Sequence, residues 1–160
     1  DSSIDLITDW FLDTPLDGIA ATNGTHNRTG LHTSRASLDK IGSGRLSGAP
    51  LTRRAVEVVR RVHTRSGGNY PIIGGGGVMS ADDVRAMLDA GADLVQLYTG
   101  YVYNGPGIVK EVCRALIADA EAQKAAATAQ TAVPAPKAGD SELSGAAAAL
   151  QTPQESTENQ

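Results

Sequence analysis

The sequence predicts an α/β fold in which short parallel strands alternate with helices, and three observations support this class. Three short apolar runs, at residues 17–22, 71–74 and 94–98, are typical of buried strands. Segments with apolar residues at helical spacing precede, separate and follow these runs. Such alternation predicts parallel strands joined by right-handed crossovers. Because the strands are apolar throughout, we expect both faces of the sheet to be covered.

The first predicted helix follows Ser2 and Ser3, which can cap it. Its apolar residues are Ile4, Ile7, Trp10 and Phe11. After the first strand, a long polar loop rich in Gly, Ser and Arg extends to about Pro50. The next predicted helix, residues 52–63, has an apolar face that consists of Ala55, Val58, Val59 and Val62.

Ser80 and Asp83 match a capping box at the start of a further helix, which Gly91 is expected to end. The residues of this helix that we expect to face inward are Val84, Met87 and Leu88. A last helix is predicted after residues 105–106, a Gly-Pro pair. Its residues at helical spacing are Val109, Val112, Cys113, Leu116 and Ile117.

Three strands make a poor free-standing sheet, whereas this alternation is typical of a (β/α)8 TIM barrel. Such a barrel needs about 250 residues, and this chain has room for under half of one. We therefore interpret residues 1–122 as the C-terminal portion of a TIM barrel. The chain starts at Asp1, with neither an initiator Met nor a basic-then-apolar leader, and is expected to be cut from a longer protein.

Residues 123–160 form a low-complexity tail, which we expect to be disordered because it buries too little apolar surface. A docking tail is the alternative. The whole net charge of −4 lies in residues 118–160, since residues 1–117 hold 12 cationic and 12 acidic side chains. A neutral folded part gives no electrostatic case for nucleic acid. A single cysteine excludes an internal disulfide, and no apolar run is long enough for a transmembrane helix.

Candidate binding residues follow each predicted strand, where α/β barrels place their sites. The backbone N–H groups of residues 74–77, four glycines before a capped helix, suit an anion such as phosphate; a tight turn is the alternative. Tyr98 and Thr99 follow the next strand and could share that phosphate, with local packing as the alternative. Asn23 offers donors and an acceptor to a planar heterocycle, although Asn-Gly is also a common turn pair.

Other polar residues favour structural roles. The histidines, His26, His32 and His63, lack metal-ligand spacing, and His63 is expected in solvent. Cys113 is expected on the core-facing side of the last helix, where a cysteine is inert. The arginines of the helix at residues 52–63 are interpreted as a solvated face; they are Arg53, Arg54, Arg60 and Arg61.

Four motifs and a helix start follow one another in a specific order. They are Asp17-Gly-Ile-Ala-Ala-Thr-Asn23, Leu46-Ser-Gly-Ala-Pro-Leu51, Pro71-Ile-Ile-Gly-Gly-Gly-Gly-Val78, Leu94-Val-Gln-Leu-Tyr-Thr-Gly-Tyr101 and Gly105-Pro-Gly107. Their order and spacing resemble those of dihydroorotate dehydrogenases. The fourth motif and the helix start resemble class 2, the quinone-dependent and membrane-associated type. The resemblance covers about residues 4–117.

This resemblance implies a barrel that holds FMN at its C-terminal mouth and oxidises dihydroorotate to orotate in pyrimidine biosynthesis, with quinone as electron acceptor. The FMN-binding residues that it implies are Thr22, Gly48, Gly77, Tyr98 and Thr99. The substrate-binding residues are Asn23 and Gly24. The catalytic Ser, a flavin-contacting Lys and the N-terminal membrane segment of class 2 all precede this region. No catalytic residue is therefore assigned in this chain, which is expected to be inactive alone. The resemblance also implies a peripheral location at the bacterial cytoplasmic membrane or the mitochondrial inner membrane.

Two positions depart from the family pattern. Gly24 stands where the family usually has Thr, which removes a hydroxyl expected to bind orotate. Gly75 replaces a usual Val and loosens the strand end. Two alternatives stay open: a non-catalytic half-barrel remnant that binds a phosphorylated ligand or nothing, and part of another FMN barrel such as a dihydropyrimidine dehydrogenase or a dihydrouridine reductase. An upstream catalytic Ser favours the dihydroorotate enzyme, and an upstream Cys favours the dihydropyrimidine type or a class 1 relative.

Overall fold

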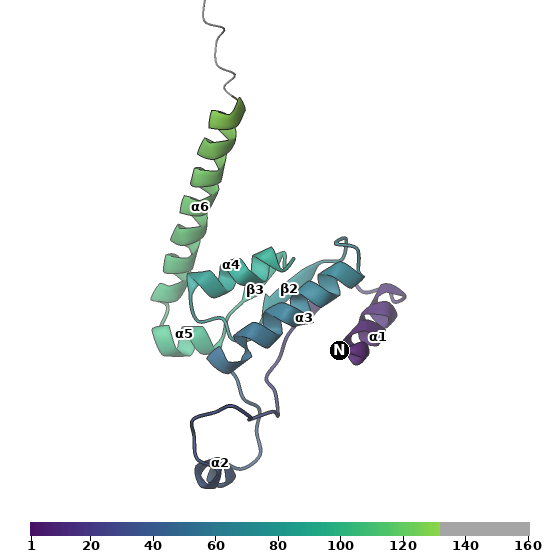
Figure 1. Ribbon diagram of the computed structural model, residues 1–160, viewed down its shortest axis with the longest axis vertical. Helices are drawn as coiled ribbons and strands as arrows, with labels where there is room; N and C mark the ends of the chain where they lie inside the picture. The colour runs from purple at the N-terminus through teal and green to yellow at the C-terminus, as the bar shows by residue number, and fades with distance from the viewer. Residues whose placement is uncertain (132–160) are drawn as a thin grey trace, which may run out of the picture.

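The computed structural model describes residues 1–131, drawn in colour in Figure 1. The part of the predicted tail from residue 132 onward lies outside the described residues. The elements follow in the order α1 (Ser2–Leu12), β1 (Ile19–Ala21), α2 (Arg35–Ile41), the 3-10 helix η1 (Ala49–Leu51), α3 (Thr52–Arg65), β2 (Ile72–Gly75), α4 (Ala81–Asp89), β3 (Leu94–Gln96), α5 (Thr99–Asn104) and α6 (Gly107–Thr131).

The three predicted strands form one parallel sheet in the order β1-β2-β3. Ile19 of β1 pairs with Ile72 of β2, and Ile73 pairs with Leu94 of β3. Helix α3 connects β1 to β2, and α4 connects β2 to β3. The α/β class and the strand-helix alternation predicted from the sequence are therefore confirmed.

The prediction that both sheet faces are covered is wrong. Ile72 is fully buried on the face that contacts α3 and α4. On the opposite face, Ile73 is 41% exposed and its partner Leu94 is 64% exposed. Because side chains alternate between the two faces of a strand, a run that is apolar throughout places apolar residues on both. Helices among the described residues cover only one face.

The core lies between the sheet and its two crossover helices. Val59 of α3, Ile72 of β2 and Met87 of α4 have no exposed surface, and each comes from a different element. The predicted apolar face of α3 is confirmed for Ala55, Val59 and Val62, whereas Val58 packs at the edge of the core. Each buried aliphatic side chain contributes about 1.5–3 kcal/mol relative to exposure, so these helices hold the sheet in place.

Helix α1 packs on α3 through ion pairs and the buried Thr8, and of its predicted apolar residues Ile4 packs against the core. Ile7 and Trp10 are mostly exposed, and Thr8 is the buried residue of the helix. The Thr8 hydroxyl donates to the backbone oxygen of Ile4 at 2.8 Å, so its burial leaves no unpaired polar atom. The predicted N-terminal capping is also wrong, since Asp1 is the N-cap and makes no side-chain capping bond.

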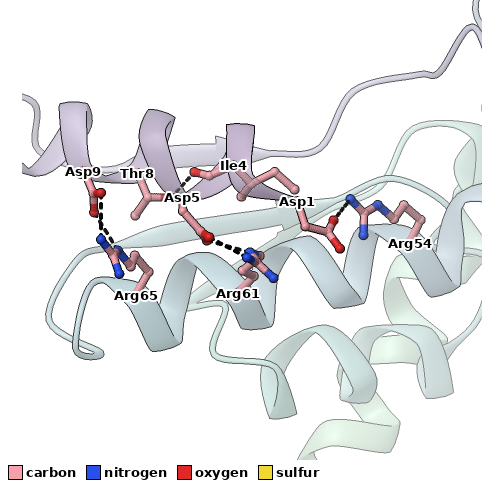
Figure 2. A network of polar contacts seen from close by, with 8 residues as sticks. All are labelled: Asp1, Ile4, Asp5, Thr8, Asp9, Arg54, Arg61 and Arg65. Carbon is pink, nitrogen blue, oxygen red and sulfur yellow. Dashed lines mark hydrogen bonds and ion pairs between the residues drawn. The ribbon is translucent and has the colours of Figure 1, made fainter.

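Three ion pairs join α1 to α3 along their whole contact (Figure 2). Asp5 accepts from Arg61 at 2.6 Å, and Asp9 accepts two hydrogen bonds from Arg65 at 2.7 and 2.8 Å. A third pair links Asp1 to Arg54. These carboxylates recur every four residues, which places them on one face of the helix. The prediction of a solvated arginine face is confirmed for Arg53, Arg54 and Arg60, which are exposed, and is wrong for Arg61, which is partly buried.

The capping box of α4 is confirmed. The Asp83 backbone N–H donates to Ser80 Oγ at 3.3 Å, and the Asp83 carboxylate accepts from the Met79 N–H at 2.9 Å. Gly91 follows the helix with a φ of +101°. A Cβ atom at Gly91 would lie 2.2 Å from His63 Cγ. His63 is thus half-buried against this turn, and the prediction that it lies in solvent is wrong.

The buried face of α6 agrees with the prediction at Val112 and Leu116 and differs from it at the other three positions. Ile108 and Val112 are buried, whereas Val109, Cys113 and Ile117 are exposed. Helix α6 contacts α4 and α5 through a face that includes Ile108 and Val112, each one position before a predicted residue. Cys113 therefore points outward. The Arg85 guanidinium of α4 also donates to Asp119 at 2.6 Å.

The domain boundary predicted at residues 122–123 falls inside α6, which continues to Thr131. Residues 123–131 are therefore helical rather than disordered. Four of these nine residues are alanine, the residue with the highest helix propensity, so the segment forms helix without burying an apolar face.

Replacing Gly91 by Ala is expected to destabilise the fold by about 2–3 kcal/mol, because a positive φ and a clash with His63 act together. The matched control is Gly67→Ala, where φ is +68° but a Cβ would meet only Asn69 Nδ2 at 4.0 Å. That variant should lose about 1 kcal/mol. Urea unfolding measures both, and equal losses would show that the His63 contact does not matter.

The ion pairs predict an acid-dependent loss of stability. Hydrogen bonding to Arg61 lowers the pKa of Asp5, and Arg65 does the same to the pKa of Asp9. Because the folded pKa lies below the unfolded one, the stabilisation is present above the ordinary carboxyl pKa of about 3.9 and is lost as the pH falls through it toward the folded pKa.

Asp5→Asn should therefore lower the Tm near neutral pH, and this loss should shrink as the pH falls below about 3.9 toward the folded pKa of Asp5. Asp13→Asn is the control, since Asp13 forms no salt bridge within residues 1–131. Thermal unfolding followed by circular dichroism measures the Tm. A Tm loss in Asp5→Asn that is the same at every pH would contradict the ionic origin of the contact.

Candidate functional site

The C-terminal ends of the three strands meet at one edge of the sheet and line a cleft of about 370 Å³. Small-molecule sites have volumes of about 300–1,000 Å³, so the cleft has room for a ligand of that class. All seven binding residues predicted from the sequence line it: Thr22, Asn23, Gly24, Gly48, Gly77, Tyr98 and Thr99. The structure brings together residues that are up to 77 positions apart. Which ligand each contacts stays a prediction.

Thr22 is held at the end of β1 by two contacts with Gly75. Its backbone N–H donates to the Gly75 oxygen at 2.7 Å, and its hydroxyl donates to the same oxygen at 3.1 Å. A Cβ atom at Gly76 would lie 2.6 Å from Thr22 Oγ1. The hydroxyl proton is thus used within the protein, and the oxygen lone pairs remain to accept from a ligand.

The glycine loop after β2 is packed directly against the start of α3. Gly77 has a φ of +81°, and a Cβ atom there would lie 2.3 Å from the Thr52 nitrogen. The Thr52 hydroxyl lies 2.6 Å from the Gly77 oxygen. Only glycine fits at this position, because both the φ and the close approach exclude a side chain. The loop therefore presents backbone rather than side chains to the cleft.

The end of β3 is joined to the loop before α3. Thr99 Oγ1 lies 3.1 Å from Ser47 Oγ, and a Cβ atom at Gly48 would lie 3.0 Å from the Thr99 methyl group. Gly48 has a φ of +84°. Tyr98 is 78% exposed, so the packing alternative considered for its side chain is not observed. Thr99 and Gly48 thus close one wall of the cleft.

Asn23 and Gly24 form the opposite part of the cleft, after β1. The Gly24 N–H donates to Asn23 Oδ1 at 2.7 Å, which leaves the Asn23 amide NH2 group to donate to a ligand. A Cβ atom at Gly24 would lie 2.9 Å from both the Leu46 oxygen and Arg45 Cβ. Arg45 and Leu46 therefore fill the space that the Thr side chain expected at position 24 would need.

Sequence reasoning missed two polar residues of the cleft, Ser47 and Gln96. Ser47 lies inside a quoted motif, and its contact with Thr99 is visible only in three dimensions. Gln96 could have been found from the sequence, because a polar residue near the end of an apolar strand points to a special environment. Gly76 belongs to the glycine run, which by itself does not reveal which glycine faces Thr22.

Among residues 1–131, none of those that line the cleft is charged. It can bind and orient a polar, planar or phosphorylated molecule through hydroxyls, amides and backbone groups. Within residues 1–131, no group of His, Cys, Asp and Glu side chains is arranged to hold a metal ion. No helix within residues 1–131 is both long enough and apolar enough to cross a membrane.

Comparison with known proteins agrees with this geometry. Residues 1–119 match the family model described as dihydroorotate dehydrogenase. The dihydroorotate dehydrogenase (quinone) of Kineococcus radiotolerans is 42% identical over 118 residues, which are 74% of this chain and 32% of that protein. The protein of the same name from Pseudarthrobacter chlorophenolicus is 48% identical over 106 residues, covering 66% of this chain and 30% of that protein.

Two crystal structures of DHODH from Eimeria tenella have the same fold over the matched region. The complex with ferulenol has a TM-score of 0.63 and 32% identity, and covers 69% of this chain and 29% of that one. The ligand-free form has a TM-score of 0.63 and 33% identity. The chain thus spans about 30% of the length of the relatives it matches. From its family match and its quinone-type relatives, we conclude that it belongs to the dihydroorotate dehydrogenase family.

Proposed function

We propose that this chain forms the FMN- and orotate-binding edge of a quinone-dependent dihydroorotate dehydrogenase, which oxidises dihydroorotate to orotate in pyrimidine biosynthesis. The observation that carries the proposal is the single cleft in which all seven predicted residues meet. With quinone as acceptor, the proposed location is the surface of a membrane that contains it.

The cleft fits FMN by its chemistry. Backbone at Gly77 and the hydroxyl of Thr99 suit a phosphate, because no carboxylate lines the cleft to repel it. Gly48, which has no side chain, and the Thr22 hydroxyl oxygen would suit an isoalloxazine ring. The chemistry that FMN supplies when bound is acceptance of hydride from dihydroorotate and delivery of electrons to quinone.

The residues of this chain would bind FMN and orotate and orient them relative to each other. The Asn23 amide would donate to the orotate ring, with its oxygen already held by the Gly24 N–H at 2.7 Å. The contact between Thr99 and Ser47 would keep the phosphate end rigid. Proton removal from dihydroorotate is assigned by family resemblance to a Ser outside residues 1–160.

A half-barrel remnant that binds a phosphorylated ligand is the second candidate, and Gly24 favours it. The segment at Arg45 and Leu46 occupies the space that a side chain at Gly24 would need. Under this alternative, FMN or another phosphorylated ligand binds while orotate does not.

Thr99→Ala should weaken FMN binding about tenfold or more, since a hydrogen bond to a charged group contributes about 1.5–3 kcal/mol. Thr99→Ser is the matched control, because it keeps the hydroxyl and removes only the methyl group near Gly48. Quenching of FMN fluorescence during titration of the full chain measures the Kd. An unchanged Kd in Thr99→Ala would refute the phosphate assignment.

Asn23→Ala should lower the affinity for orotate about tenfold in the FMN-loaded protein and leave FMN retention unaltered. Isothermal titration calorimetry measures orotate binding, and the flavin absorbance of the purified protein measures retention. If the unaltered chain binds FMN but no orotate, the remnant alternative is correct.

A further inference from the structure

Residues 26–45, which we call the basic loop, carry four cationic side chains and one carboxylate. The cationic residues are Arg28, Arg35, Lys40 and Arg45, and the carboxylate is Asp39. The rest of residues 1–117 holds eight cationic and eleven acidic side chains. The neutral balance of the folded part therefore conceals a net charge of +3 in the basic loop and a negative charge elsewhere.

The basic loop is closed at its base by a short antiparallel bridge. Thr25 N–H donates to the Leu46 oxygen at 3.0 Å, and Leu46 N–H donates to the Thr25 oxygen at 2.7 Å. Arg28 donates to the Gly44 oxygen at 3.0 Å, which links the two arms of the loop. These bonds, together with α2, give the loop an ordered shape rather than that of a free chain.

Both ends of the basic loop lead directly into the cleft. Gly24 precedes the bridge and Ser47 follows it, and both line the cleft. Arg45 Nη1 donates to the Gly24 oxygen at 3.3 Å, which places one guanidinium beside a cleft residue. Figure 1 shows α2 beyond the same end of the sheet at which α3 and α5 begin.

The positive charge of the basic loop is largely uncompensated. Within residues 1–131, its only salt bridge joins Arg35 to Asp39 at 3.4 Å. Arg28 and Arg45 donate to carbonyl oxygens, which carry no formal charge. Lys40 and Arg45 are exposed. The carboxylates of α1 are occupied by arginines of α3, so they do not neutralise the loop.

We propose that the basic loop attracts phosphate- or carboxylate-bearing ligands and speeds their entry into the uncharged cleft, with Arg45 as the cation at its mouth. This inference rests on the proposed function, because FMN and orotate are both anions. Charge beside a binding site raises the association rate by about 10–10³-fold. The loop would thus supply the attraction that the cleft lining itself lacks.

The test measures the association rate of FMN with the full chain by stopped-flow fluorescence quenching. The test variant is Lys40→Gln with Arg45→Gln, which removes two positive charges from the basic loop. The control is Arg114→Gln with Lys124→Gln, which removes two positive charges from exposed positions of α6. Circular dichroism compares the folding of all three proteins.

The association rate constant should fall at least about threefold in the loop variant and much less in the α6 control. In the unaltered chain, it should also fall between about 0.01 M and 0.15 M salt, as the Debye length shortens from about 30 Å to about 8 Å. In the loop variant, this salt dependence should be weaker.

Equal association rates in the loop variant and the α6 control would overturn the inference and leave the proposed function intact. Failure of the unaltered chain to bind FMN at all would overturn both. A loop variant whose rate falls but keeps the full salt dependence of the unaltered chain would also overturn it, because the loss would not be electrostatic.

Discussion

Ile72 is the residue through which the parallel sheet is joined to its covering helices. It pairs with Ile19 of the neighbouring strand, and Ile73 after it pairs with Leu94 on the other side. This register determines where each strand ends, and so brings the three loops of the cleft to one edge. A slip of one residue would turn Ile72 away from α3 and α4. The packing of the core and the assembly of the cleft therefore depend on the same set of backbone hydrogen bonds.

Close backbone contacts then hold the loops in place. Gly77 lies against Thr52, and Gly48 lies against Thr99, so segments far apart in the chain share one wall. Because these contacts use glycines with positive φ, this wall of the cleft presents backbone and small hydroxyls. None of the lining residues within residues 1–131 is charged. A binding site of this kind discriminates by shape and hydrogen bonding, whereas long-range attraction must come from charges outside it.

The charges of the protein are separated in space. The carboxylates of α1 are paired with arginines of α3 (Figure 2), whereas three of the four cationic side chains of residues 26–45 form no salt bridge within residues 1–131. Asp5 and Asp9 stabilise a helix contact and do not reach the cleft. The zero net charge of residues 1–117 is thus the sum of a paired helix interface and a basic loop whose charge is balanced by acidic residues elsewhere.

Local features could be predicted from the sequence because each depends on a few neighbouring residues. The three strands, the Ser80 capping box and the glycine turn at Gly91 belong to this group, as do the seven residues of the cleft, which follow motifs in a known order.

Tertiary structure decided the features that depend on distant partners. Helix α1 turns its acidic face inward because its partners are arginines 53–56 residues away, and Cys113 is exposed because α4 and α5 contact the adjacent face of α6. Periodicity in a sequence reveals that a helix has two faces, but the elements packed around it determine which face is buried.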